Sequence, residues 1–493
     1  MMYNSLINTL FFSSSFFLAV IYTFNILCAF LSSNSMLFQF PGFSVLGALS
    51  VILFSIVLII CSLKKDLFFL FLPFVLLAFP NVINDFFPSF MMGPIIESRV
   101  ASFSYITHID LFLLYGLFFL KKSSKQIINQ KEILKFLFFL NLILFFFLLT
   151  IFFTSSEDLL FLFATGNYQL RYILIFILYL LRVDLEKKHF QYVIYGFSFS
   201  LWFLLIESSF FSLKTGRDHL ISGSLAANVF ANITAAITLF FVFIKSKTFN
   251  LDNYFFQIIR FITIIVGFLI MIFNGTRMAM LSFFLSGLSF YVLTSFKVKD
   301  IFQFISRLIG YSILFFIFVL IALQFDKFRS IINIFNDLIN LKFELNEDTA
   351  SLFARLHMYK VSLNMILEQW FIGVGPGRWN FLKYEYGFQQ MGTLLTNTLL
   401  DPHSDYLSYI SQYGIFGLFM IGFILFKPSI QFFKNPQDYY SYFGIIPFTL
   451  IISGLTNSNT LKHQIFATVA MLLFLVIQKH KKPITNENSI YWN

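Results

Sequence analysis

Residues 401–417 read DPHSDYLSYISQYGIFG, and this segment joins a polar turn directly to the start of an apolar run. It follows a glycine-rich stretch, GVGPGRW at residues 373–379, and a helical stretch that opens near Thr349 and carries Arg355. A histidine, an arginine and a glycine hinge therefore lie at a boundary between polar and apolar sequence. Because nearly all of the remaining chain is apolar, we expect any chemistry to take place at this boundary.

Composition identifies the chain as a membrane protein. Hydrophobic residues make up 58% of the 493 residues, and charged residues make up 12%. A water-soluble domain carries roughly 25% charged residues, so that class is excluded. Apolar runs of about 18 residues or more recur along the chain, as they do in transmembrane helices. The formal net charge of +10 is explained by basic loops on one side of a membrane and does not indicate a nucleic-acid partner.

The apolar runs predict an all-α polytopic fold with about 12–14 transmembrane helices, each matched to a hydrocarbon core of roughly 30 Å. The predicted spans lie at about 9–31, 43–63, 67–80, 104–120, 133–153, 168–181, 190–210, 224–244, 256–273, 278–295, 308–324, 404–426, 440–456 and 463–478. Lysine and arginine clusters, such as Lys64–Lys65 and Lys121–Lys122, fall in alternate loops. By the positive-inside rule these loops and both termini face the cytoplasm.

The outward loop at about 325–403 is far longer than a simple connector, and loops of that length are usually functional or disordered. Leucine, isoleucine and tryptophan recur in it at helical spacing, so we expect an amphipathic helix that lies along the outer face, half in lipid or against the spans. Its apolar positions are Leu352, Leu356, Leu363, Ile366 and Trp370, and its polar positions are Ser351, Arg355 and Ser362.

Three arginines stand next to spans on the outward side: Arg217, Arg277 and Arg355. A guanidinium near hydrocarbon costs about 2.5–3.5 kcal/mol unless it is paired or reaches water. A single such arginine is explained by snorkelling to the interface, but three near one boundary, with few acids beside them, favour a binding role. The planar fork of arginine suits phosphate oxygens. We therefore predict an extracytoplasmic pocket for a lipid-linked phosphate or diphosphate.

His403 is the leading candidate for a general base, because it lies at the first turn of a span and an unperturbed histidine titrates at a pKa of about 6.5. The alternative is a capping or interfacial histidine without a catalytic task. His219 is the rival candidate, since Arg217 and Asp218 adjoin it.

The glycines at 373, 375 and 377 follow a helix and lack the spacing of a nucleotide-binding loop. They predict a tight turn that brings Arg378 and Trp379 back toward the membrane. Asp401, His403 and Asp405 match no known metal-ligand spacing, so we expect neither a metal nor another cofactor.

These features together resemble the superfamily of O-antigen ligases and O-antigen polymerases, which are bacterial membrane glycosyltransferases. Four stretches carry the likeness: residues 217–224 followed by Asn228; Thr276–Arg277; Arg355 with the glycines at 373–377; and residues 402–407 followed by 413–417. The sequence departs from the family pattern at Ser404, where asparagine is usual, and at Gln412, where glutamate is frequent.

The resemblance implies an enzyme of the bacterial inner membrane that moves a glycan from undecaprenyl diphosphate to an acceptor hydroxyl on the periplasmic face. His403 would be the general base, and Arg277 and Arg355 would hold the diphosphate. Arg217, His219 and Arg378 would assist in binding. Transfer would invert the sugar carbon and need no metal, because arginines can stabilise a departing diphosphate. The chain would comprise N-terminal transmembrane helices at 1–210 and a ligase-like region at 211–493, which contains the 325–403 loop and C-terminal helices at 404–478.

Several alternatives stay open at this point. A ligase would use lipid A–core as acceptor, a polymerase would use another lipid-linked repeat, and a third relative would glycosylate protein. From a different class, a flippase or transporter of lipid-linked oligosaccharide also suits the number of spans. The long outward loop and the gathering of arginines and histidine on one face disfavour a transporter, whose site usually lies near the midplane of the membrane.

Overall fold

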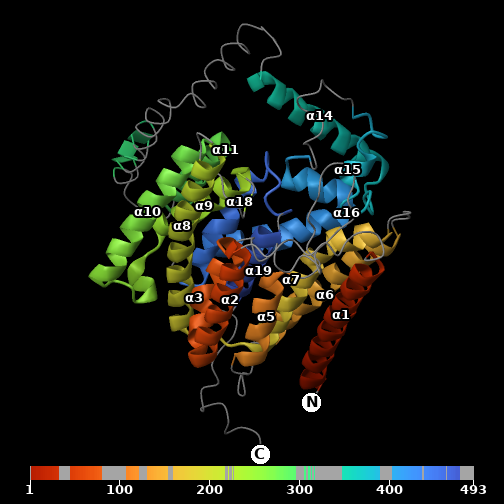
Figure 1. The fold of residues 1–493 in the computed structure, drawn as a ribbon, viewed down its shortest axis with the longest axis horizontal. Helices are drawn as coiled ribbons and strands as arrows, with labels where there is room; N and C mark the ends of the chain where they lie inside the picture. Colours follow the sequence, from red (N-terminus) through yellow and green to blue (C-terminus); the bar gives the residue numbers. More distant parts are fainter. Residues whose placement is uncertain are drawn as a thin grey trace, which may run out of the picture. The chain divides into compact units, whose positions relative to one another are not determined.

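The computed structural model describes residues 2–32, 45–79, 107–120, 130–153, 159–216, 220, 225, 227–295, 347–388, 402–435, 438–461 and 463–477, with single positions between 302 and 316. The elements in this part of the chain are helices (Figure 1). Each predicted span overlaps a helix except 308–324, most of which lies outside the described residues. The all-α prediction is therefore confirmed.

The chain forms two units by its internal contacts. The first unit comprises residues 1–200 and 463–493, and the second comprises residues 201–462. Helix α8 (Lys187–Thr215) contributes to both. The boundary at residues 210 and 211 that the sequence suggests stays a prediction.

The first unit is built around helix α7 (Leu159–Arg182), which contacts α1 (Met2–Ser32), α5 (His108–Phe119), α6 (Gln130–Phe153) and α19 (His463–Ile477). Its remaining helices are α2 (Val45–Leu63), the 3₁₀ turn η1 (Lys65–Leu67) and α3 (Phe68–Leu77). The side chains of α7 from residue 168 to 180 are buried in continuous sequence. A helix that is apolar and buried all round occupies the centre of a bundle.

The second unit is built around α9 (Ala227–Phe243), which contacts α10 (Tyr254–Asn274), α11 (Arg277–Ser295) and α18 (Ile445–Ser453). Gly267 of α10 permits close packing against α9, since a Cβ at this position would collide with Thr238 of α9. The other elements are η3 (Ser246–Phe249), α14 (Glu347–Glu368), α15 (Trp379–Leu382), α16 (Asp405–Ile421), the π-helical η4 (Gly422–Phe426), α17 (Lys427–Lys434) and η5 (Ser441–Gly444).

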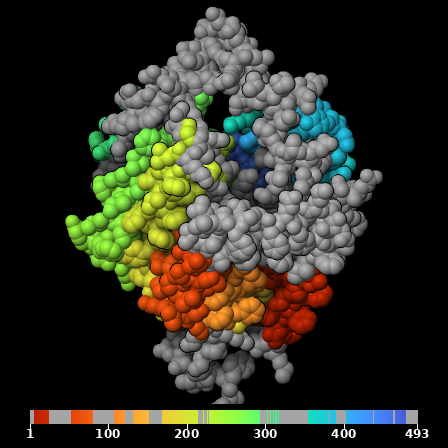
Figure 2. All heavy atoms as spheres, in the orientation of Figure 1, coloured from red at the N-terminus to blue at the C-terminus, as the bar shows by residue number. Residues whose placement is uncertain are grey.

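Among the described residues, five helices are long and apolar enough to cross a membrane: Ser5–Thr23, Lys131–Ile151, Lys187–Leu213, Tyr254–Asn274 and Asp405–Lys434. Helix α10 exposes a stripe of large apolar side chains that water would solvate poorly. Phe255, Ile258, Ile262, Ile265 and Leu269 recur on one face of this helix and are exposed. This part of the chain, in green, lies at the surface in Figure 2. A large exposed apolar stripe of this kind marks contact with lipid or a partner. The protein is a multi-pass membrane protein.

A buried ion pair joins two helices of the first unit. Arg171 Nε lies 3.0 Å from Asp110 Oδ1, and both side chains are almost completely buried. The other oxygen, Oδ2, accepts hydrogen bonds from the backbone N–H and hydroxyl of Thr107, which caps α5. Asp110 therefore both completes the N-terminal cap of α5 and neutralises a cation inside the bundle. Hydropathy alone does not reveal this double role.

We expect Arg171→Met to destabilise the protein by about 3–5 kcal/mol, because it leaves the Asp110 carboxylate buried without its cation. The double variant Asp110→Asn/Arg171→Met should be less damaging, since the amide oxygen can still accept from Thr107 and no buried charge remains. Thermal unfolding midpoints in detergent compare the two. A double variant that is less stable than the single one would contradict this account.

Candidate functional site

His403 occupies a turn with unusual backbone geometry. Its φ of 48° places it in the left-handed region, and among the described residues Asn250 is the other non-glycine residue with positive φ. This conformation costs a side-chain-bearing residue roughly 1–2 kcal/mol. Pro402 and Ser404 on either side are buried, and His403 itself is half-buried. Strained residues of this kind persist only where the surrounding structure holds them.

The groups that hold the His403 turn come from the loop after α18. The backbone N–H of Asp405 donates to the carbonyl of Gly454 at 2.9 Å, and the Ser404 hydroxyl donates to the same carbonyl at 3.3 Å. Asp405 Oδ1 in turn accepts from the N–H and hydroxyl of Thr460 at 2.8 and 2.7 Å. Ser404 also accepts from Leu407 N–H and so caps α16. The turn at 453–460 thus holds the His403 turn through these hydrogen bonds, and we call it the platform.

Arg355 lies on α14, whose next turn reaches the same platform. The hydroxyl of Tyr359 donates to the carbonyl of Leu455 at 3.4 Å, one residue beyond the acceptor used by Asp405. Burial raises the pKa of Tyr359, and the positive charge of Arg355 opposes that rise. Arg355 is half-buried and lies one helical turn from this contact. The helix that carries Arg355 and the turn that carries His403 are therefore hydrogen-bonded to adjacent backbone carbonyls, those of Leu455 and Gly454.

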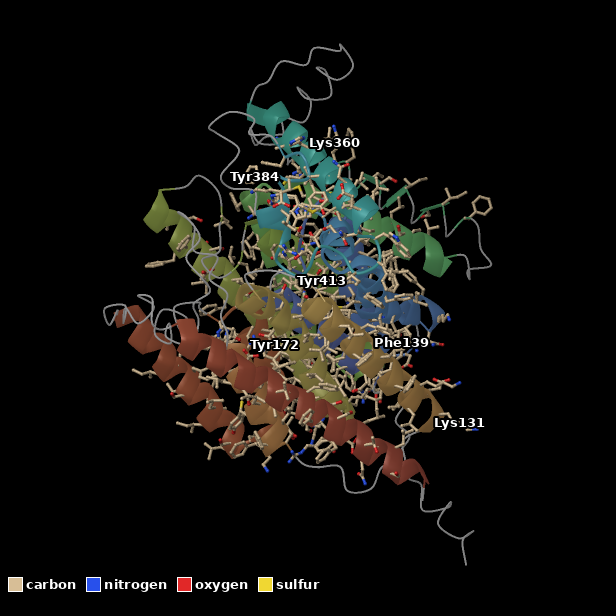
Figure 3. All side chains as sticks on the ribbon, turned by 90° about the vertical axis from the view of Figure 1, so that its right-hand side faces the viewer. Lys131, Phe139, Tyr172, Lys360, Tyr384 and Tyr413 are labelled. Atoms are coloured by element: carbon tan, nitrogen blue, oxygen red, sulfur yellow. The ribbon has the colours of Figure 1, made fainter. Side chains whose placement is uncertain are left out.

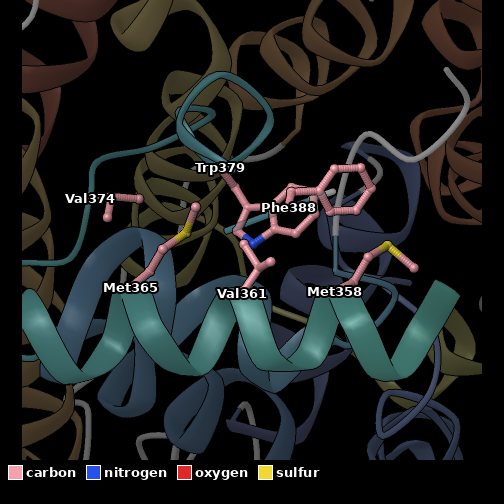
Figure 4. Packing of buried hydrophobic residues seen from close by; sticks show 6 residues of the cluster. All are labelled: Met358, Val361, Met365, Val374, Trp379 and Phe388. Carbon is pink, nitrogen blue, oxygen red and sulfur yellow. The ribbon is translucent and has the colours of Figure 1, made fainter. Parts of the chain in front are cut away.

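The helix predicted in the long loop is present as α14, but its exposed and buried positions differ from the predicted ones. Leu356, Leu363 and Trp370 are exposed, whereas Ser362 is completely buried. Ser362 accepts a hydrogen bond of 2.8 Å from the indole of Trp379. The buried cluster between α14 and the segment that follows it consists of Met358, Val361, Met365, Val374, Trp379 and Phe388 (Figure 4). The burial of this serine is explained by the indole N–H of Trp379, 17 residues downstream, which donates to it.

The glycine hinge fits into a break in α16. Gly414 has φ 58° and ψ −142° in the middle of that helix, and a Cβ there would collide with the carbonyl of Phe371. Val374 and Gly375 donate their N–H groups to the carbonyls of Ser411 and Gln412 at 2.8 and 2.9 Å. These carbonyls belong to the last turn before the break, where helix bonding is interrupted. The predicted tight turn is present. It is hydrogen-bonded to α16, which begins two residues after His403.

Arg378 follows this hinge and is half-buried. Its Nη1 donates to the carbonyl of Val374 at 3.4 Å, and its charge acts on Tyr386, whose pKa is raised by burial and by neighbouring Glu368 and Glu385. Figure 3 shows Lys360 of α14 and Tyr384 above Tyr413 of α16, and both α14 and α15 contact α16. Arg378 directly precedes α15, near acids of the loop.

Arg277 is half-buried and begins α11 directly after a left-handed C-cap at Gly275. The chain before α9 is bonded to this turn, since Leu220 N–H donates to the carbonyl of Phe273 at 3.0 Å and Asn274 Nδ2 donates to the carbonyl of Leu220 at 2.8 Å. Arg217 and His219 themselves lie outside the described residues. The dipole of α11 repels the Arg277 cation at its N-terminus. An anion at the same place would be attracted by the dipole and by Arg277.

Helix α9 connects the arginine turn with the platform. Thr276 donates to Asn228 Oδ1 at 3.5 Å, and Asn228 lies one turn before Asn232 on the same face. Asn232 Nδ2 donates to Asn459 Oδ1 at 2.8 Å, next to the Thr460 that binds Asp405. The segments that carry Arg277, Arg355 and His403 are thus linked in the second unit. The links form one polar network, which consists of these hydrogen bonds and the turn of α9 between Asn228 and Asn232.

Comparison with known families gives a match over this region. Residues 261–422 match the family model described as O-antigen ligase. These residues form an O-antigen ligase domain. The match covers Arg277, Arg355, the hinge and His403 and ends at Gly422, where the π-helical segment begins. No curated protein matches the chain. Membership of this domain implies a ligase- or polymerase-type glycosyltransferase that acts on lipid-linked glycan.

Sequence reasoning missed the platform, which lies beyond the matched domain. Asn457, Ser458, Asn459 and Thr460 are buried although all four are polar. A run of four polar residues between two apolar helices reads as an ordinary loop. The signal that distinguishes it is the absence of charged residues from positions 453–460, most of which are asparagine, serine or threonine.

Replacing the glycine at the break of α16 tests the fit between hinge and helix in the ligase domain. Gly414→Ala should destabilise the protein by more than the roughly 1–2 kcal/mol of left-handed strain, because the methyl group also meets the Phe371 carbonyl. Gly387→Ala is the matched control, since Gly387 has φ 90° but open space around a Cβ. Thermal unfolding in detergent measures both. Equal losses in the two variants would show that the collision does not matter.

Proposed function

We propose that this protein transfers a glycan from undecaprenyl diphosphate to an acceptor hydroxyl on the periplasmic face of the bacterial inner membrane. Orientation follows the basic loops, with both termini in the cytoplasm. The observation that carries the proposal is the strained His403 turn, fixed by Gly454 and Thr460 within the polar network that also holds Thr276 and Tyr359.

The donor is held by arginine. Arg277, at the start of α11, presents a guanidinium beside the positive end of a helix, where two phosphate groups find both charge and N–H donors. Arg355 adds a second cation from α14. As the bond between the sugar carbon and the phosphate oxygen breaks, negative charge develops on the departing diphosphate. Fixed cations at that place lower the barrier, because they need no reorganisation during the reaction.

The acceptor is activated by histidine. A neutral imidazole at His403 takes the proton from the acceptor hydroxyl while its oxygen attacks the sugar carbon. The new glycosidic bond forms opposite the leaving group, so the configuration at that carbon inverts. The proton ends on His403, and the electron pair leaves with undecaprenyl diphosphate. The turn that holds His403 keeps its ring in one place, as proximity requires.

Ligase and polymerase share this chemistry and differ in the acceptor. A ligase delivers the finished glycan to lipid A–core, and a polymerase delivers it to another lipid-linked repeat. Surface glycolipids of a deletion strain separate them. Loss of all long glycan from lipid A–core, with intact polymer on its carrier, identifies a ligase, whereas a core bearing one repeat identifies a polymerase.

Complementing that strain with His403→Asn tests the base. Asparagine tolerates the left-handed backbone but cannot accept a proton near neutral pH, so we expect normal membrane abundance and loss of transferred glycan. His357→Asn, which alters another histidine of the long loop, should restore the wild-type profile. Full glycan transfer by His403→Asn would remove the proposed base.

Arg277→Lys tests the grip on the diphosphate. Lysine keeps the charge but lacks the planar fork, so kcat/KM with purified lipid-linked donor should fall roughly 10²–10³-fold, as when one transition-state donor is lost. Arg260→Lys on the preceding helix, α10, is the matched control. Arg260 donates to the carbonyls of Phe241 and Val242 and serves helix packing, so its replacement should alter stability and spare kcat/KM. Near-normal activity of Arg277→Lys would argue against a bidentate grip.

A further inference from the structure

Two buried asparagines of the second unit have carboxamide atoms that no described residue pairs. Asn457 is 2% exposed, and neither its Oδ1 nor its Nδ2 has a hydrogen-bond partner among the described residues. Asn232 is fully buried, and its Oδ1 is likewise unpaired within that part of the chain, although its Nδ2 binds Asn459. Buried amides are nearly always bonded, and one left unpaired lowers stability unless a ligand completes it.

Both amides belong to segments that connect the two reactive ends of the proposed site. On one side, Asn232 follows Asn228 by one helical turn, and Asn228 accepts from Thr276, the neighbour of Arg277. On the other side, Asn457 lies three residues before Thr460, which holds Asp405 and with it the His403 turn. A sugar whose diphosphate is held near Arg277 and whose anomeric carbon meets an acceptor near His403 would contact the segments that connect the two.

Carboxamides suit a sugar better than a diphosphate. They carry no charge to pair with phosphate oxygens, but each offers one acceptor and two donors. A sugar hydroxyl or acetamido group also both donates and accepts, so one amide can form two bonds to it. A site that hydrogen-bonds such groups discriminates strongly, because its buried amides stay unpaired when the wrong ligand binds.

We infer that Asn457 and Asn232 bind the hydroxyl or acetamido groups of the donor sugar that is joined to the diphosphate. This inference rests on the proposed function and deepens it by assigning recognition of the sugar to the turn at 453–460 and to α9. The phosphate is bound elsewhere, by arginine. The two parts of the donor are therefore recognised by separate residues.

The test measures binding, so it does not depend on turnover. One probe is undecaprenyl diphosphate, and the other is the glycan-bearing carrier lipid extracted from cells that lack this protein. Wild-type protein in detergent should bind the glycan-bearing lipid more tightly. Asn457→Leu should weaken that binding about tenfold, the value of two hydrogen bonds, and should leave the affinity for undecaprenyl diphosphate unchanged. Its thermal midpoint should be unchanged or raised, because leucine removes an unpaired polar group without changing the shape greatly.

Asn459→Leu is the matched control. Asn459 donates to Ser453 at 2.8 Å and accepts from Asn232, so its replacement breaks existing bonds and should lower the thermal midpoint. Asn457→Ala provides a second variant with the same expected affinities. If the Asn457 variants lose stability and bind both lipids less well, the residue is structural and the inference is overturned. Unchanged affinity for both lipids would show that Asn457 is completed by water only, which also overturns it. A wild-type protein that binds neither lipid would overturn the proposed function as well.

Discussion

A backbone group that leaves the helix inside a membrane protein must find another partner within the protein. In the second unit, three departures from helix near the proposed site are each bonded to or packed against another irregular segment or helix end. The break of α16 at Gly414 lies against Phe371, just before the hinge. The His403 turn is hydrogen-bonded to the carbonyl of Gly454, and Leu220 is bonded to the end of α10. The irregular segments thus stabilise one another, and these are the segments on which the proposed chemistry depends.

Mutual bonding also explains how a costly conformation persists at His403. Its left-handed backbone is opposed by sterics, but the residues that follow it make four hydrogen bonds to Gly454 and Thr460. The same loop accepts from Tyr359 of α14 and from Asn232 of α9. A displacement of any one helix would therefore move the histidine, and rigidity of that kind is what a general base requires in order to meet its substrate.

Hydropathy predicted the helices well because each transmembrane segment is a local pattern that lipid imposes. The approximate place of His403, Arg355 and the hinge was also readable, since they lie at the edge of an apolar run. The pairing of Asp110 with Arg171, the burial of Ser362 under Trp379 and the platform around Asn459 were not readable. In each case the partner is distant in sequence, and a single sequence contains no signal that joins the two.

The two kinds of buried polar group in this protein differ in one informative respect. Asp110 in the first unit is matched by a cation and by the cap of its own helix, so its polarity serves the fold. Asn457 in the second unit has no such partner among the described residues, and a leucine of nearly the same shape would fit the fold better. An amide at this position lowers the stability of the fold and forms no hydrogen bond with the described residues that would offset the loss. A free-energy cost of this kind is understandable where the missing hydrogen bonds are formed with substrate, which is why we assign to this turn the recognition of the donor sugar.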